Sequence, residues 1–315
     1  MIAFVFPGQG AQKLGMGKAL ADAYPVCRAT FDEADAALGE PLSTLCFEGP
    51  DDQLMLTEFT QPAILAMSTA VLRLVRSQGV AASFAAGHSL GEYSAHVAAG
   101  TLSFADALRT VKRRGRYMQD AVPVGEGAMA AVLGLDAADV ARACEDAADG
   151  QIVTPANLNS PGQVVIAGHT AAVARAGQRA KALGARRVLP LPVSAPFHCA
   201  LIKPAEDRLA PELRALDARD PSIPVVANVD AEPKRTATEA IDALVRQISA
   251  PVLWENVVRR LVADGVHIFV ELGPGAVLAG LIKKIDRSVT VYSVEDGAGL
   301  DALLAGLSAG AKAQS

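Results

Sequence analysis

One pentapeptide, Gly87-His88-Ser89-Leu90-Gly91, constrains the fold of this chain more than any other feature. Apolar residues precede it and helix-forming residues follow it, which predicts a strand, a sharp turn and a helix with Ser89 at the apex. Glycine is needed on both sides because side chains there would clash across the turn. The pattern predicts that the hydroxyl of Ser89 is exposed as a nucleophile beside a helix N-terminus. A glycine-rich turn with no chemical role would give the same spacing.

Composition limits the classes of protein to which the chain can belong. Its 315 residues suffice for two unequal domains, and contents of 51% hydrophobic and 20% charged residues describe a globular core and not a disordered chain. Lysine and arginine number 29 against 34 aspartate and glutamate residues, a formal charge of −5. This acidic balance argues against nucleic acid as the main partner.

The cysteines and the apolar segments indicate the compartment. Four cysteines (Cys27, Cys46, Cys144 and Cys199) are scattered without a C-x-x-C pair, which predicts reduced, buried thiols and no metal site. The first six residues lack a basic segment and are too short for a secretory signal. No apolar run approaches the roughly 18 residues of a transmembrane helix. We therefore expect a cytoplasmic protein that does not enter a membrane.

Short apolar runs alternate with amphipathic segments, which predicts an α/β fold. Residues 2–6 form a buried strand that ends at Pro7-Gly8, and the glycine-rich loop 7–12 follows it. This loop is either a tight connection or a backbone that approaches a ligand closely. The same reasoning predicts strands at 223–227, 267–271 and 289–294, helices from Thr60 to Gly79, at 241–248 and up to 285, and a frayed end at 308–315.

Residues 126–194 show a different order of predicted strands and helices. The elements expected there are a strand at 128–135, a helix at 136–148, strands at 152–158 and 163–167, a helix at 170–183 and a strand at 186–191. This β-α-β-β-α-β order is that of a ferredoxin-like motif. Because α/β alternation resumes afterwards, the segment is interpreted as a small subdomain inserted into a larger unit made of residues 1–125 and 195–315.

A basic helix follows the serine turn. Ser103 and Asp106 resemble a capping box, and an apolar stripe that includes Met118 continues from Phe104. Arg114 lies only about 60° from the centre of this stripe, at about 100° per residue. A guanidinium in that position either extends along the apolar surface to reach water or meets an anion.

A serine nucleophile needs a general base, for which histidine is suited near neutral pH. Of the five histidines, His198 is the best candidate, because it lies on a proline-bracketed loop where the larger unit resumes. His88 precedes Ser89 on the expected strand and should point away from it. No aspartate or glutamate stands out to orient the base, which suggests an acyl-enzyme that waits for an acceptor other than water. Cys199 is the alternative nucleophile beside His198.

Taken together, these motifs resemble the malonyl-CoA:acyl carrier protein transacylases of bacterial fatty acid synthesis over essentially the full length. The family has an α/β-hydrolase-like body with a ferredoxin-like insert, which agrees with the pattern above. Besides the serine turn, the resemblance rests on Phe6-Pro7-Gly8-Gln9-Gly10, Thr60-Gln61-Pro62-Ala63, the stretch 113–119, the stretch 157–163, Pro196-Phe197-His198, Gln247 and the stretch 270–275.

The resemblance implies a role for each residue that matches the family pattern. Ser89 would carry the malonyl ester, and His198 would act as its general base and acid. The backbone N–H groups of Gln9 and Leu90 would form the oxyanion hole. Gln247 would orient His198 through a carbonyl, in place of the carboxylate of a hydrolase triad.

Substrate recognition is implied in the same way. Arg114 would pair with the free malonyl carboxylate, which decides its orientation in favour of the anion. Met118, Phe197 and Asn159 would contact the substrate. No cofactor or metal is implied, because the CoA thioester is a substrate and the acceptor carries the phosphopantetheine.

The partners implied are malonyl-CoA and holo acyl carrier protein, bound by a monomer. The carrier protein of this family is acidic, so a local basic face is expected, with Lys112, Arg113, Arg116, Lys283 and Lys284 as candidates. Three alternatives are a sister acyltransferase of a polyketide or malonate decarboxylase system, a serine esterase or thioesterase, and a non-catalytic docking protein.

Overall fold

The computed structural model describes residues 1–193 and 195–313, which form an α/β fold with two β-sheets. The larger sheet has six strands in the order β10-β9-β1-β2-β7-β8. Its neighbours are parallel except for the antiparallel pair β7 and β8. The strands are β1 (Ile2–Phe6), β2 (Phe84–Gly87), β7 (Val225–Val226), β8 (Pro233–Lys234), β9 (Ile268–Leu272) and β10 (Thr290–Val294).

Strand β1 shows why both faces of the larger sheet are covered. Phe4 and Phe6 enter the core on one face, whereas Ala3 and Val5 enter a second core on the other. All four side chains are fully buried, as expected for a parallel strand between two layers of helices.

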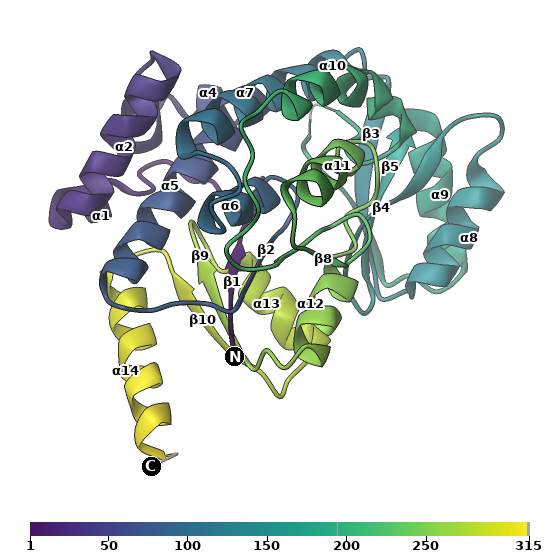
Figure 1. Cartoon of the computed structure of the whole chain (residues 1–315). Coiled ribbons are helices and arrows are strands. Elements are labelled where there is room, and N and C mark those ends of the chain that lie inside the picture. The colour runs from purple at the N-terminus through teal and green to yellow at the C-terminus, as the bar shows by residue number, and fades with distance from the viewer. Residues whose placement is uncertain (194, 314–315) are drawn as a thin grey trace.

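Helices cover the two faces of this sheet. The first core takes in α1 (Lys18–Ala23), α2 (Pro25–Leu38), α3 (Leu42–Glu48), α4 (Asp51–Leu54), α5 (Thr57–Ser77), α6 (Gly91–Ala98), α7 (Phe104–Asp120), α10 (Lys203–Arg214), α11 (Ala237–Gln247) and α14 (Gly297–Ala313). The second takes in α12 (Trp254–Ala263) and α13 (Val277–Ile285). Figure 1 shows α14 projecting away from the rest of the fold at the C-terminus.

The smaller sheet is antiparallel, in the order β4-β5-β3-β6. Its elements run in the predicted order along the chain, and α8 and α9 pack on it as a third core. Figure 1 shows this group on one side of the molecule, beside the larger sheet. Its elements are β3 (Gly127–Leu133), α8 (Ala137–Ala147), β4 (Val153–Ser160), β5 (Gln163–His169), α9 (Thr170–Ala182) and β6 (Arg187–Pro190).

Most expected elements are present, but several bounds were wrong. Helix α5 begins at Thr57 and not at Thr60, because the hydroxyl of Thr60 donates to the carbonyl oxygen of Leu54 (2.6 Å) and does not cap the helix. The strand expected at 223–227 shortens to the two residues of β7, and helices α1–α4, α12 and α14 and strand β8 were not predicted. The end expected to fray is helical through Ala313, and residues 314–315 lie outside the described part of the chain.

Candidate active site

Ser89 lies on the sharp turn between β2 and α6. It has a φ of 50°, a left-handed conformation that residues other than glycine rarely adopt. A Cβ at Gly87 would lie 2.0 Å from the backbone of Gly91, and a Cβ at Gly91 would lie 2.0 Å from the carbonyl oxygen of Phe6. Only glycine fits at either position, as the pentapeptide predicts.

The fold brings Ser89 and His198 together across 109 residues of sequence. Ser89 Oγ lies 2.7 Å from Nε2 of His198. Nδ1 of the same ring lies 3.0 Å from the carbonyl oxygen of Gln247 and 3.2 Å from that of Ala250. Because carbonyl oxygens can only accept, Nδ1 carries the proton and Nε2 can accept the proton of Ser89. This is the geometry of a nucleophile and its base, oriented by backbone carbonyls.

Burial keeps His198 uncharged. The side chain is buried, and this burial, followed by the positive charge of Arg114, lowers its pKa to about 3. The neutral ring is the form that accepts a proton. The adjacent thiol of Cys199 donates to the carbonyl oxygen of Pro196 (3.1 Å), and burial raises its pKa to about 11. Cys199 is therefore a protonated thiol and a poor nucleophile at neutral pH.

Arg114 points into the site and does not extend to water, so the snorkelling alternative is wrong. Arg114 is 1% exposed, and burial lowers the pKa of its guanidinium. Nη1 donates to Gln61 Oε1 (3.0 Å), whereas Nη2 donates to Ser89 Oγ (3.2 Å) and to Gln247 Oε1 (2.9 Å). The guanidinium also lies over the ring of Tyr93, 5.4 Å from its centroid. All acceptors that the described residues supply to this cation are neutral.

Two backbone donors are available beside Ser89. Gln9 and Leu90 line the same hollow as Ser89, and neither N–H has an acceptor among residues 1–193 and 195–313. The N–H of Ser89 itself donates to Oδ1 of Asn228 (2.7 Å) and is not available. A free N–H is what an oxyanion donor requires, and the N–H groups of Gln9 and Leu90 meet this requirement.

Asn228 and Glu92 are site residues that the sequence analysis missed. Asn228 holds the turn on both sides, because its Nδ2 also donates to the carbonyl oxygen of Gly87 (2.7 Å). Glu92 is fully buried and accepts from the N–H of Asn228 (3.0 Å) and from Nε2 of Gln247 (2.9 Å). The position of Glu92 next to the pentapeptide was a usable signal, whereas Asn228 only follows an expected strand.

Gln61 was also missed as a site residue, although it lies in one of the motifs that carry the resemblance. Its Oε1 accepts from Arg114, and its Nε2 lies 3.8 Å from the sulfur of Met118. An inward-facing glutamine on a helix that is buried for most of its length marks a polar pocket. That burial becomes visible only in the structure.

The hollow at Ser89 has a volume of about 120 Å³ and lies where the two sheets approach each other. Met118 and Phe197 line it as expected, whereas Asn159 lines an adjoining hollow bounded by α13. His88 was expected to lie on the strand, but β2 ends at Gly87 and His88 follows it directly. His88 lines both hollows, and its Nε2 lies 2.8 Å from Oδ1 of Asn159.

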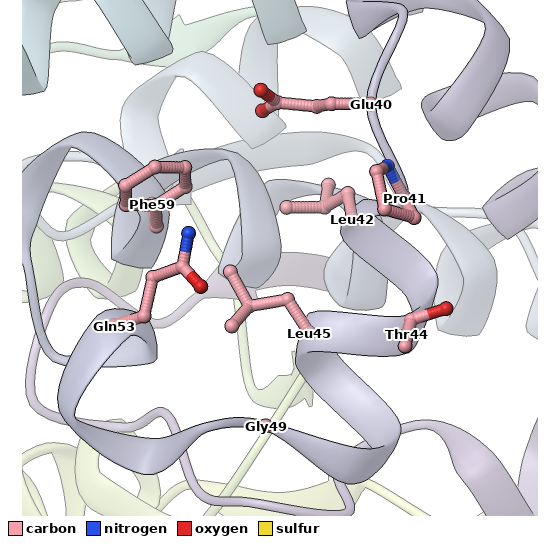
Figure 2. Close-up of a pocket in the computed structure, with 8 residues that line it drawn as sticks. All are labelled: Glu40, Pro41, Leu42, Thr44, Leu45, Gly49, Gln53 and Phe59. Atoms are coloured by element: carbon pink, nitrogen blue, oxygen red, sulfur yellow. The ribbon is translucent and has the colours of Figure 1, made fainter.

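Another hollow lies apart from this chemistry, among α3, α4 and α5. Figure 2 shows the side chains of Leu42 and Leu45 pointing toward Phe59 and Gln53, which line the hollow with them. The carboxylate of Glu40 stands at its edge, where it pairs with Lys112. No serine, cysteine or histidine is among its lining residues, so it lacks the means for acyl transfer.

Most of the candidate basic residues already have partners. Lys112 pairs with Glu40, and Arg113 lies 2.6 Å from Glu212. On α13, Lys283 donates to the backbone, and Lys284 donates to Gln163 (3.1 Å), which lines the hollow next to Ser89. Arg116 is exposed on α7.

The remaining expectations concern thiols, metals and membranes. All four cysteines are buried, as predicted. Within residues 1–193 and 195–313, no three His, Cys, Asp or Glu side chains converge as a metal site would require. In the same part of the chain, every helix is too short or too polar to cross a membrane.

Comparisons with known proteins identify the relatives of this chain. A family model described as an acyl transferase domain matches residues 3–302. The malonyl CoA-acyl carrier protein transacylase of Escherichia coli K12 is 52% identical over 96% of this chain and 98% of its own length. The protein of the same name from Bacillus subtilis 168 is 48% identical over 94% and 93%.

Solved structures give the same result. The acyl carrier protein S-malonyltransferase of Vibrio cholerae superposes with a TM-score of 0.94 at 49% identity, over 96% of this chain and 99% of that one. A malonyl-transacylase in complex with its type II PKS acyl-carrier protein gives a TM-score of 0.93 at 50% identity, over 95% and 97%. Likeness of this extent, in sequence and in fold, means that the chain belongs to the malonyl CoA-acyl carrier protein transacylase family.

Proposed function

We propose that this protein transfers a malonyl group from malonyl-CoA to the phosphopantetheine thiol of an acyl carrier protein, through a malonyl ester on Ser89. The observation that carries this proposal is the buried guanidinium of Arg114 beside the Ser89–His198 pair. Because its acceptors are neutral, this cation can pair with an anionic acyl group at the distance where Ser89 reacts. The family to which the chain belongs points to the same substrate.

In the first half-reaction, Ser89 Oγ attacks the thioester carbonyl of malonyl-CoA while its proton passes to Nε2 of His198. The 2.7 Å distance between these atoms supports this transfer. The carbonyl oxygen gains negative charge and is stabilised by the N–H groups of Gln9 and Leu90, at roughly 3–4 kcal/mol for each donor in comparable sites. When the intermediate collapses, the C–S bond breaks and His198 returns the proton to the CoA thiolate.

In the second half-reaction, the phosphopantetheine thiol replaces CoA and the same atoms act in reverse. His198 takes the thiol proton, the sulfur attacks the ester carbonyl, and the proton returns to Ser89 Oγ as the C–O bond breaks. The adjoining hollow between α13 and the smaller sheet is a path by which both thioester arms reach Ser89. We infer that the reaction needs no cofactor, because thioester and thiol supply all the bonds that change.

Selectivity for malonyl follows from Arg114. A malonyl carboxylate would pair directly with the buried guanidinium, whereas an acetyl group leaves it with neutral hydrogen-bond acceptors alone. Gln247 supports both groups, since its carbonyl oxygen accepts from His198 and its Oε1 accepts from Arg114. Met118 and Phe197 supply apolar walls around the acyl chain, and Asn159 acts from the adjoining hollow.

The same proposal extends to the organisation of the chain. We assign residues 1–125 and 195–315 to an α/β-hydrolase-like catalytic subdomain and residues 126–194 to a ferredoxin-like insert. The separate core beneath α8 and α9 and the order β4-β5-β3-β6 support this division. We further propose that the chain acts as a cytoplasmic monomer, with its carrier protein on the side of Lys284.

Intact-protein mass spectrometry tests the proposed function. Mixing the enzyme with malonyl-CoA should add one malonyl group to the protein, and holo acyl carrier protein should then remove it. The Ser89→Ala variant should gain no malonyl group. An adduct that decays equally fast without the carrier protein would indicate a thioesterase, and an adduct that persists in Ser89→Ala would contradict the assignment of the nucleophile.

A further inference from the structure

Glu92 lies beneath the reacting residues as a buried carboxylate that the mechanism above does not use. It is fully buried in the first turn of α6, three residues after Ser89. One oxygen, Oε2, accepts both from the N–H of Asn228 (3.0 Å) and from Nε2 of Gln247 (2.9 Å). The other, Oε1, is buried without a donor among the described residues. Burial raises the pKa of this carboxyl to about 7.

The acceptor at Glu92 determines which way the side-chain amide of Gln247 points. An amide presents two N–H donors at one end and an oxygen acceptor at the other. Both donors of Gln247 are used, one to Glu92 and one to the carbonyl oxygen of Ser89 (2.8 Å). Its oxygen must then face the opposite way, toward Nη2 of Arg114 at 2.9 Å. If the amide turned over, its NH₂ group would face the guanidinium, a contact between donors.

Glu92 acts on the serine turn through its second contact. The N–H of Asn228 is held by Glu92, while the side chain of Asn228 binds the N–H of Ser89 (2.7 Å) and the carbonyl oxygen of Gly87 (2.7 Å). One carboxylate oxygen thus supports both the residue that holds the turn and the residue that orients the guanidinium.

We propose that Glu92 is a positioning residue for malonyl selectivity, which holds Gln247 so that Arg114 faces the free carboxylate of the acyl group. It touches neither substrate nor reacting atoms. This inference rests on the proposed function, because it requires that Arg114 bind the malonyl carboxylate. It predicts that changes at Glu92 impair malonyl transfer more than acetyl transfer, since an acetyl group makes no use of the guanidinium.

The experiment compares kcat/KM for malonyl-CoA and acetyl-CoA in three variants of the full-length protein. Glu92→Met removes the acceptor at similar length, Glu92→Asp withdraws the carboxylate by one methylene group, and Glu92→Gln keeps one acceptor oxygen. The malonyl-to-acetyl ratio should fall about tenfold or more in Glu92→Met, as expected when a hydrogen bond to a charged group is lost. Glu92→Gln should stay within about threefold of the wild type, because one oxygen can still accept from both donors.

Glu271 provides a matched control. It is another fully buried carboxylate whose pKa burial raises to about 7, and it accepts from the N–H groups of Leu278 (3.0 Å) and Ala279 (2.8 Å) at the start of α13. Glu271→Gln should reduce stability and leave the malonyl-to-acetyl ratio unchanged.

A double-mutant cycle completes the test. In an Arg114→Ala background, Glu92→Met should have no further effect on the ratio if Glu92 acts through Arg114. A wild-type ratio in both Glu92→Met and Glu92→Asp, or an equal change in Glu271→Gln, would overturn the inference. If Glu92→Met does not fold, Glu92→Asp alone decides, with a fall of about fivefold or more expected for a weakened charged hydrogen bond. Failure of the wild type to form a malonyl adduct would instead refute the proposed function.

Discussion

Removal of the Arg114 guanidinium has a large effect that can be worked out from its contacts. A malonyl carboxylate bound beside Ser89 in Arg114→Ala would be a buried charge without its partner, which costs about 3–5 kcal/mol. At about 1.36 kcal/mol per factor of ten, kcat/KM for malonyl-CoA should fall by about 10²- to 10⁴-fold. Acetyl transfer loses only the 3.2 Å hydrogen bond to Ser89 Oγ, worth about tenfold or less. The malonyl-to-acetyl ratio should therefore fall by about 10- to 10,000-fold.

The assay is the initial rate of carrier-protein acylation with each CoA donor, followed by mass spectrometry. Arg114→Lys is the control that keeps a charge but lacks the planar fork, and its ratio should lie between those of Arg114→Ala and the wild type. A pH profile gives a second readout. Because the Arg114 cation lowers the pKa of His198, its removal should raise that pKa and move the acid limb of activity to higher pH. An unchanged ratio in Arg114→Ala would refute this account of selectivity.

Three further predictions concern the elements that hold the site. Burial lowers the pKa of His96 to about 3, so below pH 6.5 the unfolded chain takes up a proton that the folded chain does not. The free energy of unfolding is therefore highest above pH 6.5 and declines as the pH falls. The free energy of unfolding of His96→Leu, measured by chemical denaturation, should rise relative to that of the wild type by about 2 kcal/mol between pH 7.5 and pH 5. A difference that stays constant with pH would contradict the lowered pKa of His96. Gly91→Ala should yield little folded protein by circular dichroism, because its Cβ would lie 2.0 Å from the carbonyl oxygen of Phe6; a normal thermal midpoint would show that the turn relaxes. Asn228→Ala leaves the N–H of Ser89 without its acceptor and should lower stability by about 1–3 kcal/mol and slow acylation by both CoA donors alike; unaltered acylation kinetics would disprove a role in holding the turn.

Local signals in the sequence predicted much of the fold. The Asp136 side chain caps α8 by accepting from the N–H of Asp139 (2.8 Å), and the Ser103 hydroxyl caps α7 by accepting from Asp106 (3.1 Å), both at the expected positions. The order of elements in the smaller sheet also follows the hydrophobic pattern. The misplaced start of α5 came from reading Thr60 as a cap, since a hydroxyl can donate as well as accept and its partner is set by packing.

Local signals in the sequence also predicted only part of the candidate active site. Sequence patterns singled out Ser89 and His198, because a nucleophile turn and a proline-bracketed loop can be recognised from neighbouring residues. They left the orientation of Arg114 open, since helical periodicity gives an angle around the helix and not the group that lies opposite. Asn228 gave no pattern, and the position of Glu92 next to the pentapeptide did not show what it binds, because the bonds of Asn228 to Ser89 and to Glu92 span 136 or more residues of the chain.

By itself, the sequence determined the strand-turn-helix at Ser89, the alternation of strands and helices and, through its resemblance to a family, the expected chemistry. Backbone sterics and hydrophobic spacing act over a few residues, so they can be deduced from neighbours in the chain. Only the tertiary structure decided that Arg114 is buried against Gln61 and Gln247, and that Glu92 supports them. Hydrogen bonds between segments that are far apart in the chain depend on how whole helices and strands pack, and the pattern of neighbouring residues does not show which segments will meet.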